Sequence, residues 1–353
     1  MQFKASQLVQ NIRSQADSLQ CVLQQQCGDG LPALLEAARL LSSARRVLIT
    51  GMGASMFASI ALQYLLCSLQ IDATVIEAGE YLHYQREAYR DAVIVIVSRS
   101  GESIEIAKLL KLLKGHQTII GISNEPGSQL AREADVNLLI GSLADQMAAI
   151  QTYTGTVLNG YLLGCAVDQQ LDRARAEVEA MLSDFSKLLS ASIENIHEWD
   201  TFLEESSSVH LLARGPSCSS ALEGALLFNE VAKMPAVGMP TASFRHGPVE
   251  LVDREFRGII FAQQGPTQHL NLALAQDLVR FGGQVRVIGP AEAQLSGLEW
   301  CKIPAISELL SPLFEIVHVQ VAALRMAELR GIAPGTFRFA PQVATDEACF
   351  ALR

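Results

Sequence analysis

The sequence predicts an α/β protein in which two similar halves each form a doubly wound, flavodoxin-like αβα sandwich around a five-stranded parallel sheet. Short apolar runs alternate with helical patterns along most of the 353 residues, as is typical of parallel strands joined by helices on both faces. Glycine-containing turns also recur at nearly constant spacing. Gly53 and Gly215 lie 162 positions apart, and Gly101 and Gly265 lie 164 apart, which favours a duplicated domain.

The N-terminal region and the first half follow this scheme in order. Residues 1–35 are expected to form a helical extension that is interrupted at Gly28-Asp29-Gly30. Residues 36–170 form the first predicted domain. Its strands are expected at 46–50, 73–78, 92–97, 117–122 and 137–140, with an apolar helix over 56–66 after the first strand and another over 104–113 after the third.

The second half repeats the pattern after a charged helical stretch at 171–200, where apolar residues recur at helical spacing and predict a connecting helix. Residues 201–335 form the second predicted domain, and the tail at 336–353 has no clear period. The strands of the second domain are expected at 208–213, 236–239, 258–262, 284–288 and 301–303.

Composition excludes several classes of protein. The formal net charge of −10, without a basic run, argues against nucleic acid or an anionic membrane as a partner. Seven scattered cysteines without a CxxC pair indicate a reducing compartment, and the histidines lack the spacing of a zinc site. The N-terminus lacks the apolar core of a signal peptide, and no apolar stretch is long enough to span a membrane. We therefore expect a cytoplasmic protein without a zinc site. No metal or organic cofactor is expected for the chemistry considered below either, because a substrate carbonyl or imine already acidifies the neighbouring C–H bond.

A turn rich in hydroxyl groups follows the third predicted strand, with the sequence Ser98-Arg99-Ser100-Gly101-Glu102-Ser103. A helix begins directly after it, and the free N–H groups and positive dipole end of a helix N-terminus favour an anion. The serine hydroxyls add donors, and Gly101 lets the backbone approach a ligand closely. The pattern predicts a phosphate site. In the alternative interpretation, Ser100 or Ser103 only caps the helix.

A second turn, Gly53-Ala54-Ser55, follows the first predicted strand. Ligands of open parallel sheets bind beyond the carboxyl ends of the strands, so Ser55 and the 98–103 turn are expected to converge on one anion. The matching segment of the second half, 262–267, lacks the serines of the first, so phosphate binding of the same kind is not expected there.

Two segments of the second half could carry acid–base chemistry. Glu223 and Glu230 lie about two turns apart in a mostly apolar helical pattern, and a carboxyl group in such a setting suits proton transfer. Glu223 fits an exposed charge or an ion pair, for instance with Lys233. His246 precedes Gly247-Pro248, which would present its imidazole from a turn, although a single histidine can also be structural.

Together these segments resemble the double sugar-isomerase-domain (SIS) proteins over almost the whole chain. The pattern is similar to the isomerase half of glucosamine-6-phosphate synthase, and to amino-sugar phosphate deaminases, isomerases and fructosamine phosphate deglycases. The resemblance is carried by the two Gly-x-Ser turns, the 98–103 turn, the segments 124–128 and 245–248, and the spacing of 16 residues between Glu230 and His246.

The resemblance implies roles for individual residues and a homodimer. Glu230 would move a proton between C1 and C2 of the sugar, and His246 would open the ring, with the histidine supplied by the neighbouring subunit in some members. The phosphate would be bound by the side chains of Ser55, Ser98, Ser100 and Ser103, with Arg99 as a helper, and by the backbone of Gly53, Ala54 and Gly101.

The chain departs from the synthase pattern at three cationic positions. Leu227 stands where the synthase has a lysine one turn before its glutamate, and Gln151 falls in the segment where it has Ser-Thr-Lys. Its C-terminal lysine corresponds to Pro341 or Gln342. Arg99, Arg245 or Arg338 would supply positive charge instead. This reduced set resembles that of deaminases and deglycases.

The sequence therefore predicts an enzyme of the glucosamine-6-phosphate deaminase or isomerase type, acting on a hexosamine or fructosamine 6-phosphate. No glutamine-hydrolysing half precedes these motifs and Met1 is not followed by a cysteine, so glutaminase activity is not expected. Ketose–aldose isomerisation and deglycation use the same acid–base pair and remain open. From a different class, a non-catalytic sugar-phosphate sensor would explain the lost lysines.

Overall fold

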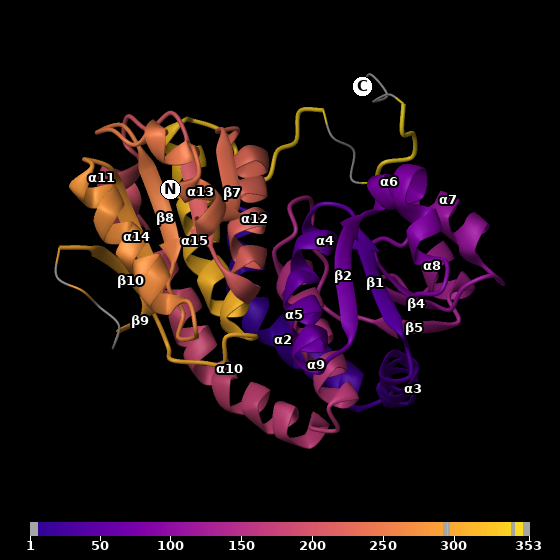
Figure 1. Cartoon of the computed structure of the whole chain (residues 1–353). Helices are drawn as coiled ribbons and strands as arrows, with labels where there is room; N and C mark the ends of the chain where they lie inside the picture. The colour runs from indigo at the N-terminus through magenta and orange to yellow at the C-terminus, as the bar shows by residue number, and fades with distance from the viewer. Residues whose placement is uncertain (1–5, 292–294, 296, 340–342, 349–353) are drawn as a thin grey trace. The chain divides into compact units, whose positions relative to one another are not determined.

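The computed structural model describes residues 6–291, 295, 297–339 and 343–348. The chain divides into two compact units, each built around one sheet (Figure 1). The first-sheet unit comprises Ser14–Leu182 and Phe337–Arg353, and the second-sheet unit comprises Met1–Arg13 and Ser183–Thr336. The boundary falls within α10 (Leu171–Glu194), the helix that occupies most of the predicted connecting stretch.

The first sheet has the strand order β2-β1-β3-β4-β5, with all neighbours parallel. This is the flavodoxin-like order, in which the direction of winding reverses between the first and third strands. Its strands are β1 (Arg46–Gly51), β2 (Asp72–Glu77), β3 (Val93–Val97), β4 (Ile119–Ser123) and β5 (Val136–Leu139).

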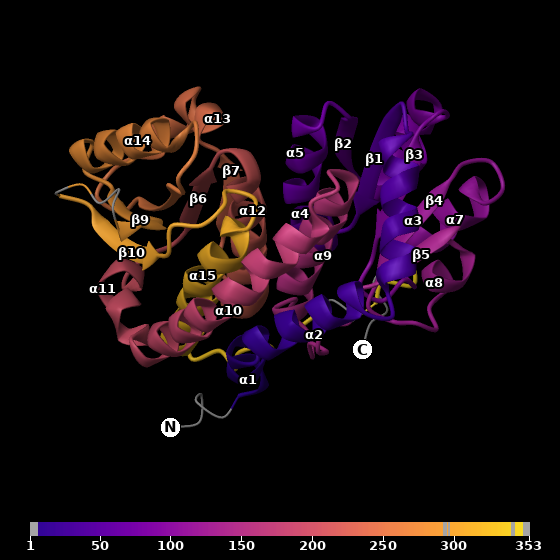
Figure 2. The ribbon, with the colours of Figure 1, turned by 90° about the horizontal axis from the view of Figure 1, so that it is seen from below.

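Helices cover both faces of the first sheet (Figure 2). On one face, α7 (Ile104–Leu113) and α8 (Gln129–Glu133) pack with α6 (Ala78–Glu80) and the short turns Tyr81–Gln85 and Arg86–Tyr89 over an aliphatic cluster. On the other face lie α4 (Ala54–Ala58), α5 (Ile60–Ser68) and α9 (Gln151–Val167). The helix α9 is buried on all sides because α2 (Gln15–Cys27) and α3 (Leu31–Ser42) also pack against it.

The second sheet repeats this topology, with the order β10-β9-β8-β6-β7. Counted from β6, it is the same flavodoxin-like order, so the predicted fold class of two similar doubly wound domains is confirmed. Its strands are β6 (Val209–Ala213), β7 (Ala236–Pro240), β8 (Arg257–Phe261), β9 (Gln284–Pro290) and β10 (Glu299–Ile303).

Two pairs of helices cover the second sheet (Figure 2). On one face, α12 (Cys218–Leu227) packs against α15 (Ser311–Leu329), and on the other α13 (Thr241–Arg245) and α14 (Gln268–Arg280) enclose an aromatic and aliphatic core. The remaining elements are α1 (Gln7–Arg13), α11 (Asp200–Leu203) and the short turns Ile196–Trp199, Gly215–Ser217, Phe228–Ala232 and Pro248–Leu251.

The predicted strands are all present, and each is shifted by no more than two residues at either end. The break at Gly28-Asp29-Gly30 is also confirmed, between α2 and α3. The single apolar helix expected over 56–66 is wrong: the structure has two helices, α4 and α5, that meet at Ser59. The Ser59 hydroxyl donates to the carbonyl oxygen of Ser55 at 2.7 Å, a back-bond that bends a helix.

Among the described residues, no helix is both long and apolar enough to cross a membrane. Six of the seven cysteines lie in the described part of the chain and all six have free thiols, whereas Cys349 lies outside it.

Candidate functional site

The ends of β1 and β3 place the two predicted anion-binding turns at one edge of the first sheet. The two strands are parallel neighbours with Gly51 paired to Val97, so the residues that follow them lie side by side. The chain then turns to α4 on one face of the sheet and to α7 on the other. This reversal makes the β1–β3 edge the position at which doubly wound sheets bind ligands.

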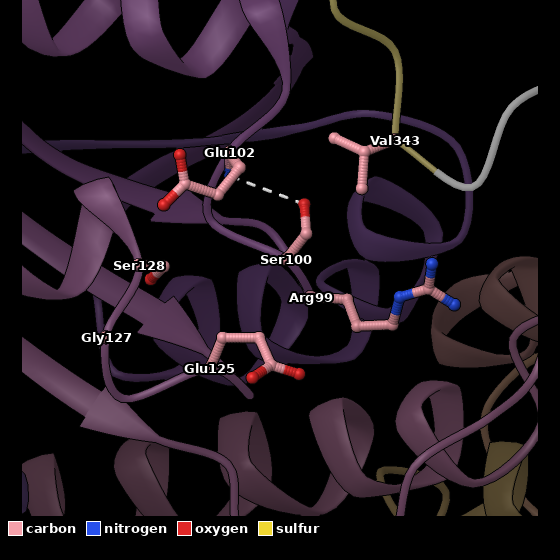
Figure 3. A pocket seen from close by; sticks show the side chains of 7 residues that line it. All are labelled: Arg99, Ser100, Glu102, Glu125, Gly127, Ser128 and Val343. Carbon is pink, nitrogen blue, oxygen red and sulfur yellow. Dashed lines mark hydrogen bonds between the residues drawn. The ribbon is translucent and has the colours of Figure 1, made fainter.

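The turn after β3 is folded by its own serines. The Ser98 hydroxyl is buried and accepts a hydrogen bond from the Gly101 N–H at 3.1 Å, and the Ser100 hydroxyl accepts one from the Glu102 N–H at 3.3 Å (Figure 3). Each hydroxyl therefore keeps its own hydrogen for donation to a ligand. Gly101 has φ 63° and Gly53 has φ 49°, left-handed conformations in which glycine is favoured.

Ser103 occupies the N-cap position of α7, but its side chain makes no capping hydrogen bond. Ser100 bonds within the turn and not to the helix. Neither hydroxyl therefore accepts a capping hydrogen bond from α7, although Ser103 occupies the N-cap position. The Ile104 N–H in the first turn of α7 donates to the carbonyl oxygen of Ala344 at 3.0 Å, so the C-terminal segment crosses the start of this helix.

That segment is held by Glu347, which contacts two residues of the first-sheet unit. Its carboxylate bonds the His83 ring at 2.6 Å and forms an ion pair with Lys108. Hydrogen bonds from Lys108 and His83 hold the pKa of Glu347 below its usual range. The tail, which has no clear period in the sequence, is thus placed beside the predicted phosphate site.

An open pocket of about 400 Å³ lies beside the turn (Figure 3). The side chain of Arg99 lies in it and donates to the carbonyl oxygen of Met147 at 3.3 Å. Glu102 accepts from the Gln129 N–H at 2.6 Å, so one of its oxygens is held by the start of α8. The pocket is lined by Arg99, Ser100, Glu102, Glu125, Gly127, Ser128 and Val343.

The predicted acid–base residues lie in the second-sheet unit. Glu230 is half-buried and lies in a π-turn, Phe228–Ala232, that continues α12. Glu223, seven residues earlier on α12, is fully buried. The helix widens at Phe228, between the two glutamates, so their spacing of seven residues does not place them in the same environment. The interpretation of Glu223 as an exposed charge is therefore wrong.

His246 is exposed and ends α13, and the following Gly247 has φ 131°. The Gly-Pro pair therefore presents the histidine from a turn, as predicted. Arg245, a candidate for the missing positive charge, lies 3.8 Å from the carboxylate of Asp277. Arg338 is exposed. Pro341 and Gln342 lie outside the described residues.

Sequence reasoning did not assign Lys233 to the site. It has a left-handed backbone with φ 52°, and its ammonium group donates to the carbonyl oxygens of Glu230 and Thr336. A cation therefore lies on the turn that carries Glu230. The position of Lys233 follows from the π-turn and could not be predicted from the sequence, because a lysine three residues after a glutamate is common on the surface of ordinary helices.

The structure thus brings Ser55, Gly53 and Ala54 to the same sheet edge as the 98–103 turn, and it places Glu230 and His246 in the other unit. In the described part of the chain, no group of three or more His, Cys, Asp or Glu side chains has the geometry to hold a metal ion.

Known proteins share this architecture. The chain is 28% identical over 325 residues to a glutamine–fructose-6-phosphate aminotransferase [isomerizing] of Pyrobaculum aerophilum, covering 90% of this chain and 54% of that protein. It spans about half the length of the curated relatives it matches.

Solved structures with 19% and 21% identity share the fold. The C-terminal domain of glucosamine-fructose-6-phosphate aminotransferase from Francisella tularensis superposes with a TM-score of 0.83, covering 94% of this chain and 98% of that one. Glucosamine-6-phosphate deaminase from Thermotoga maritima superposes with a TM-score of 0.76, covering 96% and 100%.

The family model described as SIS domain matches the chain twice, at residues 40–165 and 202–327. Each match contains one of the two five-stranded sheets with its glycine-containing turns. With both sheets matched, this chain is a member of the SIS domain family.

Proposed function

We propose that the chain is a phosphosugar enzyme that moves a proton between C1 and C2 of a hexosamine or fructosamine 6-phosphate. The observation that carries the proposal is the 98–103 turn, whose serines fold the backbone as acceptors and keep their hydroxyl hydrogens for a ligand. Together with Ser55, Gly53 and Ala54 at the same sheet edge, this turn suits the dianion of a phosphate monoester.

The chemistry is assigned to Glu230 and His246. In an open-chain 2-amino sugar, the C1 carbonyl acidifies the C2–H bond, so a carboxylate can remove that proton and form an enolamine. Return of the proton to C1 gives an imine at C2. Water then adds to the imine and ammonia leaves, which yields a ketose phosphate. His246 would pass a proton to the ring oxygen as the sugar opens.

The proposal includes a homodimer in which His246 of one copy serves the site of the other. Two similar proteins support this chemistry by their names: one is an isomerizing aminotransferase, and the other is a glucosamine-6-phosphate deaminase. Lys233 donates to the carbonyl oxygen of Glu230 and so offers positive charge on the π-turn that carries Glu230. It would stand in for the lysine that the synthase pattern has at the position of Leu227.

The test is the release of ammonia from glucosamine 6-phosphate, measured beside interconversion of glucose 6-phosphate and fructose 6-phosphate. Ammonia release identifies a deaminase, and interconversion alone identifies an isomerase. Glu230→Gln should lower kcat by roughly 10²-fold or more while phosphosugar binding persists. Glu204→Gln, the same change at an exposed turn residue, should leave kcat unaltered.

A non-catalytic sugar-phosphate sensor is the second candidate. Two positions where the synthase pattern has lysines favour it. Leu227 at the end of α12 and Gln151 at the start of α9 are buried, and neither side chain supplies the positive charge that a lysine would. Binding of hexose 6-phosphates without turnover of any would decide for the sensor and against the enzyme.

A further inference from the structure

The second sheet has its own ligand-binding edge. Gly215 follows β6 with φ 59°, as Gly53 follows β1 with φ 49°. Gly265 follows β8, as Gly101 follows β3. Since β6 and β8 are parallel neighbours, the two turns lie beside each other where the second sheet reverses its winding. Topology alone would therefore allow a second anion site.

A carboxyl group of the chain lies between these two turns. A Cβ atom on Gly265 would lie 2.6 Å from Oε1 of Glu308, and one on Gly215 would lie 3.3 Å from the same oxygen. Glu308 therefore contacts both turns at once, in the position where a doubly wound sheet binds its ligand. Partial removal from water raises the pKa of Glu308.

The serine of the second Gly-x-Ser turn is also engaged. Ser217, the counterpart of Ser55, donates its hydroxyl to Oε1 of the buried Glu315 at 2.7 Å, and Ser220 donates to Oε2 at 2.7 Å. Pro266, which follows Gly265, has no N–H to offer an anion. One hydroxyl donor of the second edge is thus engaged within the chain, and the carboxyl group of Glu308 takes up the space between the two turns.

The helices α9 and α15, which cover one face of the first and the second sheet, begin differently. In the first-sheet unit, Asp145 precedes α9 and accepts from the N–H groups of Ile150, Gln151 and Thr152, so its carboxylate caps that helix. In the second-sheet unit, α15 begins at Ser311-Pro312, and proline has no N–H to cap. The Glu308 side chain lies against the two glycine turns.

We propose that Glu308 fills the ligand position of the second sheet and thereby restricts phosphate binding to the 98–103 turn of the first sheet. The inference rests on the phosphate-binding part of the proposed function and not on the reaction. According to this inference, Glu308 is the reason why each chain binds one phosphate group and not two.

The experiment measures binding of inorganic phosphate to the full chain by phosphorus-31 NMR. The wild type should bind one phosphate per chain, and Ser100→Ala with Ser103→Ala should abolish that binding. Adding Glu308→Ala to this double variant should restore a site at least about tenfold tighter than any residual binding of the double variant. Glu308→Gln keeps the side-chain volume without the charge and should restore nothing.

Two results would overturn the inference: two phosphates bound per wild-type chain, or no new binding on removal of Glu308. If Glu308→Ala does not fold, Glu308→Ser makes the same space with a small polar side chain and is read in the same way. Failure of the wild type to bind phosphate at the first sheet contradicts the proposed function. Glu308→Ala still reports on the second sheet in that case, because its site does not involve Ser100 or Ser103.

Discussion

The carboxyl group of Glu315 is enclosed by hydroxyl groups between α12 and α15. Both of its oxygens accept hydrogen bonds from serines at the start of α12, and the side chain is fully buried. Desolvation raises its pKa to about 7, against which the bonds from Ser217, Ser220 and Ser311 act in the opposite direction. This buried residue therefore links the stability of the second-sheet unit to pH.

Glu315→Gln should remove a pH dependence of unfolding. Because the pKa of Glu315 is higher in the folded chain than in the unfolded one, its stabilising effect is complete at low pH and is lost as pH rises through about 7. The shift corresponds to about 3 kcal/mol of unfolding free energy. Between about pH 5 and about pH 8, the urea midpoint of Glu315→Gln should rise relative to that of the wild type, because only the wild type loses this contribution. His318, whose pKa desolvation lowers to about 4, contributes equally to both chains.

The exposed Glu194 on α10 provides the matched control, since the same substitution there should leave the wild-type pH slope intact. A Glu315→Gln chain whose stability changes between about pH 5 and about pH 8 by the same amount as that of the wild type would contradict this account of the buried carboxyl group.

For individual residues, the sequence predicts which side chains are candidates for binding or catalysis, but not which groups surround them in the fold. Ser98 and Ser100 were predictable as a pair because they lie four residues or fewer from the groups they bond. The partners of Ser217 lie 94 and 98 residues away on α15, and the contact of Glu308 with Gly265 also joins distant segments. Such contacts depend on how helices pack, which a local pattern does not record.

At the scale of elements, the 98–103 turn depends on a glycine with no space for a side chain. A Cβ atom on Gly101 would lie 2.3 Å from the Ser128 hydroxyl oxygen and 2.6 Å from its Cβ, and the residue also has φ 63°. The Leu130 N–H donates to the Gly101 carbonyl oxygen at 3.1 Å, so the β4–α8 segment and this turn hold each other in place.

Gly101→Ala should therefore weaken phosphosugar binding by more than about tenfold and destabilise the chain by about 1–3 kcal/mol. Gly115→Ala is the control: its φ is 76°, but a Cβ there would meet nothing within 4 Å. Gly115→Ala therefore introduces the same unfavourable backbone conformation as Gly101→Ala but no steric clash with a neighbouring side chain. Calorimetric binding and thermal unfolding of both variants measure the difference, and equal binding by the two would show that close packing at Gly101 is not needed.

The strands were predictable because each is a short apolar run bounded by turn residues, a pattern set within the segment itself. The helices were less so. At Ser59 a hydroxyl bonds the carbonyl oxygen of Ser55, and at Phe228 the helix continues as a π-turn that packs against α15. Neither changes the apolar period enough to be recognised from the sequence.

At the scale of the whole molecule, two copies of one topology have diverged. The first keeps an open turn of serines, and the second has placed carboxyl groups at its turns and carries Glu230 and His246 on other elements. The two units keep one fold although their turns differ in sequence, because the strand order, and not the turn sequence, determines how the helices pack.

If His246 acts across a dimer, two inactive variants should complement each other. In a mixed dimer of Glu230→Gln and His246→Ala, one site combines both substitutions and the other combines neither. Random exchange should therefore restore about a quarter of the wild-type activity. Mixing the purified variants after partial denaturation and refolding measures this. No recovery, with dimers present, would assign Glu230 and His246 to the same copy.

The central claim is that Glu230 moves a proton between C1 and C2 of a sugar phosphate bound at the 98–103 turn. The most direct measurement is proton NMR of fructose 6-phosphate incubated with the chain and ammonium in deuterium oxide, because the C2 imine can then form for a deaminase and an isomerase can act on the ketose itself. The account predicts that the wild type replaces a C1 hydrogen with deuterium and that Glu230→Gln, although it still binds the sugar phosphate, does not. A wild-type chain that binds the sugar phosphate and leaves its C1 hydrogens unexchanged would contradict the claim.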